Sequence, residues 1–132
     1  MAINEQIRKM AAQYRQYTAE NLSKMIKVKS YSSKEEEVCR LIVTLCEEAG
    51  FDEVRIDGLG SVIGRVGYGP KEIAFDAHID TVEVGNLDNW DFDPFSGEIK
   101  DGKVFGRGTS DQKGGAASMI TAGRILKELG YG

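Results

Sequence analysis

The hydrophobic period of the chain changes near residue 51, and this change limits the fold more than any other feature of the sequence. Before it, apolar residues recur at three- and four-residue steps, which predicts amphipathic helices. The first helix spans about residues 4–29 with at most one break. The second begins at a capping box of Ser33 and Glu36 and closes at Gly50 in a left-handed cap.

Beyond the change the period is two, which predicts strands. Residues 54–57 and 61–66 are expected to form a hairpin across a glycine-containing turn. The run 72–78 is apolar almost throughout, which is typical of a strand covered on both faces. A short strand over 103–105 and a helix over 115–129 follow. The order of helices, strands and a last helix predicts an α/β fold, with helices packed on a twisted mixed sheet.

Length, charge and composition exclude several classes of protein. The chain has 132 residues, the size of one domain, and a net charge of -4, which excludes the basic surface of a nucleic-acid-binding protein. It contains no apolar run of the ~20 residues that a membrane span needs. It opens without a secretory signal, and Cys39 and Cys46 would lie roughly 10 Å apart on one helix, too far for a disulfide. We therefore expect a cytoplasmic protein that binds neither nucleic acid nor membrane.

The single histidine is the first candidate for chemistry. His78 ends the apolar run 72–78, and open α/β sheets place ligand sites at strand ends. Asp80, two residues on, would project to the same side. A carboxylate beside an imidazole fixes the ring of a metal ligand. A satisfied core histidine beside a turn aspartate fits the same two residues, and on these residues alone it is the favoured interpretation.

Asp111 is the second candidate, because it lies among four glycines just before the last helix. A carboxylate there can bridge two cations or cap the helix. The spacing excludes a dinucleotide fingerprint, since Asp111 stands where that motif needs glycine, and it excludes a nucleophile elbow. No phosphate-loop motif occurs, and a serine triad is disfavoured because His78 is the only histidine available as its base.

Four segments together resemble one known family. In chain order they read AHIDT (77–81), NWDFDPF (89–95), DG (101–102) and GRGTSDQKG (106–114). In type, order and spacing they are similar to the dinuclear zinc peptidase/deacylase family, which includes carboxypeptidase G, acetylornithine deacetylase, succinyl-diaminopimelate desuccinylase and aminoacylase. The nearest branch is that of the selenium-metabolism-linked hydrolases, where glutamine, as in Gln112, follows the metal-bridging aspartate.

The resemblance implies a metal site and a reaction. His78 would ligate one of two zinc ions, Asp111 would bridge both, and Asp80 would have a catalytic role as the carboxylate behind His78. Cobalt or manganese are the alternative metals. A zinc-activated water would cleave amide or peptide bonds in a small peptide or an N-acyl amino acid, and the family's dimerisation domain makes a homodimer the candidate assembly.

The resemblance also implies that residues 1–132 are the N-terminal part of a catalytic domain. The family's Glu-Glu pair, its later ligands and its lid or dimerisation domain have no counterpart in these residues. We therefore expect this chain alone to be inactive, with weak metal binding or none. A different class of function stays open: a non-catalytic folded domain that acts as an interaction or scaffold piece, with His78 and Asp111 free of metal.

Overall fold

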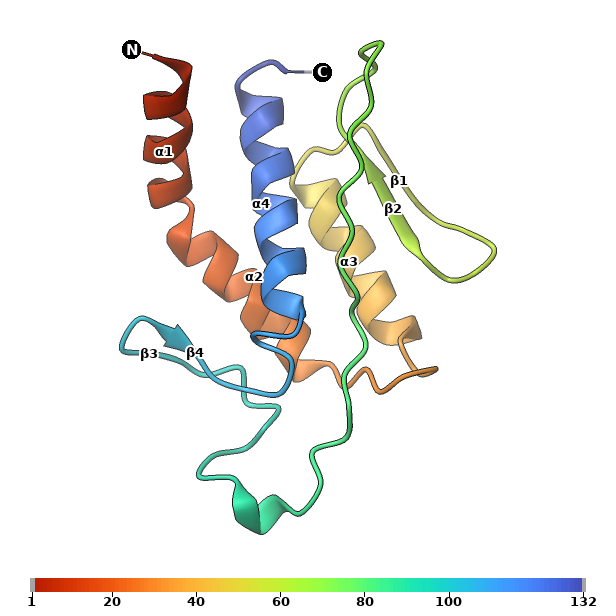
Figure 1. Ribbon diagram of the computed structural model, residues 1–132, viewed down its shortest axis with the longest axis vertical. Helices are drawn as coiled ribbons and strands as arrows, with labels where there is room; N and C mark the ends of the chain where they lie inside the picture. Colours follow the sequence, from red (N-terminus) through yellow and green to blue (C-terminus); the bar gives the residue numbers. More distant parts are fainter. Residues whose placement is uncertain (1, 132) are drawn as a thin grey trace.

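The computed structural model describes residues 2–131 and contains four α-helices within them (Figure 1). A single 3-10 turn, Leu87–Asn89, lies in the long loop before the last helix. The strands form two separate antiparallel pairs. The helices are α1 (Ile3–Gln13), α2 (Arg15–Lys27), α3 (Glu36–Glu48) and α4 (Lys113–Glu128), and the pairs are β1 (Glu53–Ile56) with β2 (Val62–Arg65) and β3 (Ile99–Lys100) with β4 (Lys103–Val104).

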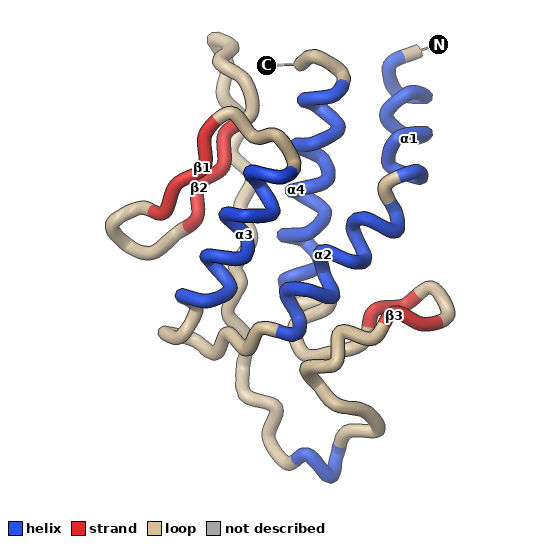
Figure 2. The backbone as a smooth tube through the Cα atoms, turned by 180° about the vertical axis from the view of Figure 1, so that it is seen from behind, coloured by secondary structure: helices blue, strands red, loops and turns tan. Residues whose placement is uncertain are grey.

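The core lies where three helices meet. Helix α4 is flanked by α1 and α2 on one side and by α3 on the other, and the β1–β2 hairpin covers the far side of α3 (Figure 2). The buried side chains come from facing stripes of α2, α3 and α4, as the helical periodicity predicts. They include Met25, Val38, Ile42, Leu45, Ala117 and Ile120. No helix among the described residues is long and apolar enough to cross a membrane.

The predicted helices are confirmed, except for the capping box at the start of the second one. The predicted first helix has its single break at Tyr14, which leaves the helical conformation and separates α1 from α2. The predicted capping box is wrong: α3 begins at Glu36 with no side-chain cap, and Ser33 has φ 69°. The backbone N–H of Ser33 instead donates to the side chain of Glu35. At the other end of α3, Gly50 adopts φ 83°, as expected.

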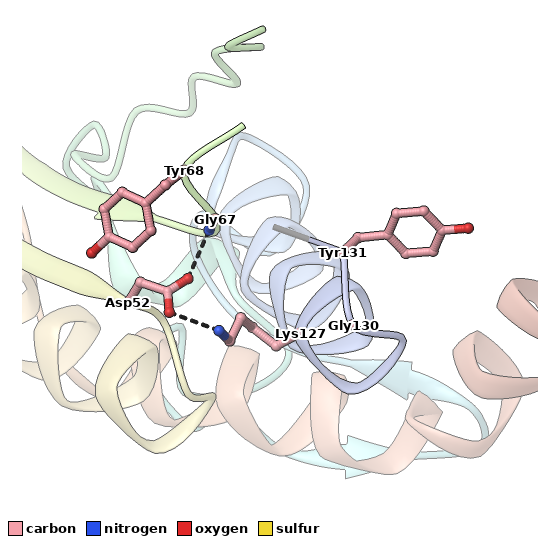
Figure 3. Close-up of a pocket in the computed structure, with 6 residues that line it drawn as sticks. All are labelled: Asp52, Gly67, Tyr68, Lys127, Gly130 and Tyr131. Atoms are coloured by element: carbon pink, nitrogen blue, oxygen red, sulfur yellow. Dashed lines mark hydrogen bonds and ion pairs between the residues drawn. The ribbon is translucent and has the colours of Figure 1, made fainter. Parts of the chain in front are cut away.

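The predicted hairpin is confirmed and is tied to the last helix. Strands β1 and β2 pair in antiparallel register, with Ile56 opposite Val62. The carboxylate of Asp52 accepts hydrogen bonds at 2.7 Å from the backbone N–H of Gly67 and from the ammonium of Lys127 in α4 (Figure 3). The hairpin is thereby fixed to α4 as well as to α3.

The expectation for residues 72–78 is wrong in this structure. The segment is extended, but it pairs with no strand among residues 2–131, and Ile73 and Phe75 are 81% and 75% exposed. Only its far end touches the core, through Ala77 and the next apolar residue, Ile79. The α/β class holds, but the strands form two small antiparallel pairs in place of one mixed sheet. A central strand needs a neighbour on each side for its N–H and C=O groups, and the described strands supply none.

Candidate metal centre

His78 and Asp111 meet although 33 residues separate them in the chain. The Nε2 atom of His78 lies 2.7 Å from Oδ1 of Asp111. His78 comes from the end of the extended segment, and Asp111 comes from the glycine-rich loop before α4. Both side chains reach solvent, with 47% and 86% of their surfaces exposed. An imidazole nitrogen and a carboxylate oxygen thus face each other in an accessible place.

Asp80 occupies the other edge of the same imidazole ring. The Nδ1 atom of His78 lies 3.2 Å from Oδ1 of Asp80 and 3.1 Å from the backbone oxygen of Asp80. The hydroxyl of Ser32 donates to the second carboxylate oxygen of Asp80. The ring is therefore held between two carboxylates, and the contact at Nδ1 is of the kind that orients a metal-ligating histidine.

Local backbone requirements bring the Asp111 loop against residues 78–81, at the end of the extended segment. Gly108 has φ 86°, and a Cβ there would lie 2.6 Å from the methyl group of Thr81. The carbonyl of Gly108 accepts a hydrogen bond from the backbone N–H of Lys113, which closes the loop around Asp111. His78, residues 80–82 and residues 106–111 together line a pocket of about 330 Å³.

Ser30 fixes the backbone that follows His78. Its hydroxyl donates to the carbonyl of Ile79 at 2.7 Å, and its carbonyl accepts from the N–H of Thr81 at 2.8 Å. Ser30 is fully buried. The two hydrogen bonds clamp the backbone on both sides of Asp80, so the segment that follows α2 positions one half of the site.

The charges around His78 favour its protonated form. The hydrogen bond to Asp111 raises the pKa of His78, and the hydrogen bond to the backbone of Asp80 adds to the rise, while desolvation opposes it. The pKa of Asp80 is lowered, chiefly by the hydrogen bond from Ser32. A positive charge is thus stabilised between two carboxylates, and a metal cation can take the place of that proton.

Comparisons with known proteins agree on one family. A sequence model of Peptidase family M20/M25/M40 matches residues 74–132. Residues 74–132 belong to this peptidase family. Escherichia coli YgeY is 51% identical over 109 residues, which cover 83% of this chain and 27% of that protein. A probable succinyl-diaminopimelate desuccinylase of Staphylococcus epidermidis is 36% identical, over 81% of this chain and 27% of that protein.

A solved structure has the same fold over the full chain. The crystal structure of human carnosine dipeptidase 1 superimposes with a TM-score of 0.77 at 21% identity, covering 100% of this chain and 32% of that one. The chain therefore spans about a quarter to a third of the length of these similar proteins.

The two side chains that face each other are of types that bind metal ions. Imidazole nitrogen and carboxylate oxygen are both zinc ligands, and a catalytic zinc takes three protein ligands and a water. Among the described residues no group of three or more His, Cys, Asp or Glu side chains could hold a metal ion. His78 and Asp111 thus offer two facing donor groups, one fewer than a catalytic zinc takes from the protein.

Three supporting residues were not anticipated from the sequence. Ser30 and Ser32 hold the Asp80 side, and Lys113 closes the Asp111 loop. None of the three carried a sequence signal for this role, and Lys113 is a single lysine between a glycine-rich loop and the predicted last helix. The two serines lie in a polar segment between predicted helices, and its sequence does not differ from that of an ordinary turn.

The pKa of His78 is expected to fall in Asp111→Asn, because an amide in place of the carboxylate removes the main cause of its increase. A raised pKa means that the His78–Asp111 contact stabilises the fold fully below about pH 6.5 and loses this effect as pH rises through the folded value. Proton NMR titration measures this directly, since His78 gives the only histidine signal.

Asp101→Asn, in the turn between β3 and β4, is the matched control and should leave the titration of His78 unchanged. An unchanged His78 pKa in Asp111→Asn would show that the 2.7 Å contact is not formed in solution.

Proposed function

We propose that this chain supplies part of the metal centre of a hydrolase that cleaves amide or peptide bonds. The observation that carries the proposal is the imidazole of His78 held between Asp80 and Asp111, with Nε2 only 2.7 Å from a carboxylate oxygen. A probable desuccinylase and a dipeptidase among the similar proteins support this reaction class. The proposed substrate is a small peptide or an N-acyl amino acid. The proposed location is the cytoplasm, and the candidate assembly is a homodimer.

Each site residue has a distinct part in this proposal. His78 would ligate one metal through Nε2, and Asp111 would bridge two metals through its exposed carboxylate. Asp80 would keep the ring oriented through Nδ1. Zinc, or cobalt or manganese in its place, lowers the pKa of a bound water towards neutrality and polarises the substrate carbonyl. The clamp at Ser30 and the tight contact at Gly108 keep the two donors facing each other.

The chain by itself is proposed to bind metal weakly and to be inactive. Two protein donors are fewer than the three that a catalytic zinc takes. The described residues hold no third donor close enough to complete a metal group. The relatives YgeY and the desuccinylase contain further polypeptide beyond the 27% that matches this chain. The remaining ligands, and the base that accepts a proton from water, would come from polypeptide of that kind.

Calorimetric titration of the chain with zinc tests the proposal. We expect weak, saturable binding that falls on the order of tenfold or more in His78→Ala and in Asp111→Asn, because each variant removes one of two donors. Lys103→Ala, on β4, is the control and should bind as the unchanged chain does.

Two outcomes would contradict parts of the proposal. Equal zinc binding in His78→Ala would remove His78 from the metal site and favour the alternative function, a scaffold piece that uses no metal. Submicromolar binding together with measurable amide hydrolysis by the chain alone would show that these residues contain a complete site.

A further inference from the structure

Lys113 is buried more deeply than any other charged side chain in the described part of the molecule. Its exposed fraction is 1%, although it is the first residue of α4. Its ammonium donates hydrogen bonds to the backbone carbonyls of Met25 and Val28, both at 2.9 Å. Within residues 2–131 no carboxylate forms an ion pair with it. A buried charge without an acidic partner is costly, and methionine or leucine would fill the space without that cost.

The two carbonyls belong to the end of α2. The last carbonyls of a helix have no partner within the helix, so they need donors from elsewhere. Lys113 donates to the carbonyl of Val28, the residue that ends α2, and to that of Met25 in its last turn, which also accepts the N–H of Val28 at 3.3 Å. The side chain therefore ties the beginning of α4 to the end of α2, across 85 residues of sequence.

The backbone of Lys113 closes the loop that carries Asp111. Its N–H donates to the carbonyl of Gly108 at 2.9 Å. Asp111 lies between these two residues, so this hydrogen bond fixes both ends of the short loop that carries it. Lys113 thus joins the Asp111 loop to the end of α2.

The same end of α2 holds the other half of the site. Ser30, two residues after Val28, clamps Ile79 and Thr81 on either side of Asp80. Hydrogen bonds therefore anchor both halves of the His78–Asp111 pair to the same short segment, residues 25–30. The distance between the two metal donors is set through this stretch.

We propose that Lys113 is a positioning residue for the metal site: its ammonium, bound to the carbonyls that end α2, holds Asp111 at the distance from His78 that a shared metal requires. This inference rests on the proposed function. It assigns a site role to a residue that is not itself among those lining the pocket and whose ammonium contacts the end of α2.

Lys113→Met tests the role, because methionine preserves the length and apolar volume of the side chain and removes its donors. Cobalt binding is measured by calorimetry and by visible absorption, which reports the ligand geometry. We expect affinity about tenfold or more weaker than in the unchanged chain, as for other residues that orient metal ligands. Lys127→Met is the matched control: it removes the Asp52 ion pair from the same helix and should leave cobalt affinity unchanged.

A second readout needs no metal. The ring nitrogen chemical shifts of His78, the only histidine, report its contact with Asp111 at a fixed pH. We expect these shifts to change in Lys113→Met and to stay constant in Lys127→Met. Urea unfolding of each variant ensures that only folded protein is compared. Should Lys113→Met not fold, Lys113→Gln, which keeps one shorter donor, replaces it with the same two measurements.

The outcomes separate the two proposals. Unchanged cobalt affinity and unchanged His78 shifts in the folded Lys113 variant would overturn the positioning role while leaving the metal site intact. Undiminished cobalt binding in His78→Ala would instead overturn the metal site itself, and the positioning role with it. Loss of affinity in the Lys113 variant, with Lys127→Met unaffected, would support both.

Discussion

Gly106→Ala is expected to lower the free energy of unfolding by about 3 kcal/mol. A Cβ at Gly106 would lie 2.3 Å from the Cγ2 methyl of Ile26 and 3.0 Å from the carbonyl oxygen of Pro94. Ile26 is fully buried, so its side chain cannot move aside into solvent. Gly106 also has φ 149°, which side-chain-bearing residues rarely adopt. Urea denaturation followed by circular dichroism measures the loss.

Gly58→Ala is the control for that substitution. A Cβ there meets no atom within 4 Å, and Gly58 is not among the glycines with positive φ. We expect at most a small gain in stability, up to about 1 kcal/mol, because alanine restricts the unfolded chain. If both variants were equally stable, the close approach of the 106–111 loop to α2 would be absent in solution.

Local pattern was sufficient for the helices and the hairpin. The stripe of α3 and the helix at the end of the chain follow from a 3.6-residue period, and β1 and β2 follow from alternation around a short turn. Each of these elements satisfies its backbone hydrogen bonds within itself or with its immediate neighbour in sequence. Such elements can be predicted without knowing what lies elsewhere in the chain.

Residues 72–78 show the limit of this approach. An apolar run indicates that a segment is suited to burial, but it does not indicate which element covers it. In this chain the segment passes along α3 and α4 with its first half uncovered (Figures 1 and 2). The capping box failed for a related reason: Ser33 has the right type and spacing, but its backbone adopts a left-handed conformation that the cap does not permit.

The candidate site was likewise predictable only in part. The motif order predicted that His78, Asp80 and Asp111 would lie together, and the structure places them in contact. Their metal roles stay a prediction. Lys113 escaped notice as a site residue because its importance comes from carbonyls 85 and 88 residues away in sequence, which no local pattern reveals.

Replacing both Ile73 and Phe75 with serine is expected to weaken self-association of the chain by at least about tenfold. Extended backbone without a partner strand, bearing exposed apolar side chains, associates with other chains. Burying one such side chain contributes roughly 1.5–3 kcal/mol, which exceeds the 1.4 kcal/mol that a tenfold change represents. Sedimentation velocity over a range of protein concentrations measures the change.

The same double variant distinguishes the exposed segment from the buried strand that the sequence predicts. Because Ile73 and Phe75 are 81% and 75% exposed, the free energy of unfolding should change by less than about 1 kcal/mol. In a buried strand each truncation would cost roughly 2–5 kcal/mol. Unfolding of the double variant would therefore mean that the segment is covered in solution after all.

Leu59→Ser distinguishes association by strand pairing from nonspecific association through exposed apolar side chains. Leu59 is 94% exposed, more than either replaced residue, but it lies in the tight turn of the β1–β2 hairpin. The turn offers no run of unpaired extended backbone to another chain. Association that falls only in the 73/75 variant would assign it to the unpaired strand, whereas an equal fall in Leu59→Ser would assign it to exposed apolar surface of any kind and contradict the role given to residues 72–78.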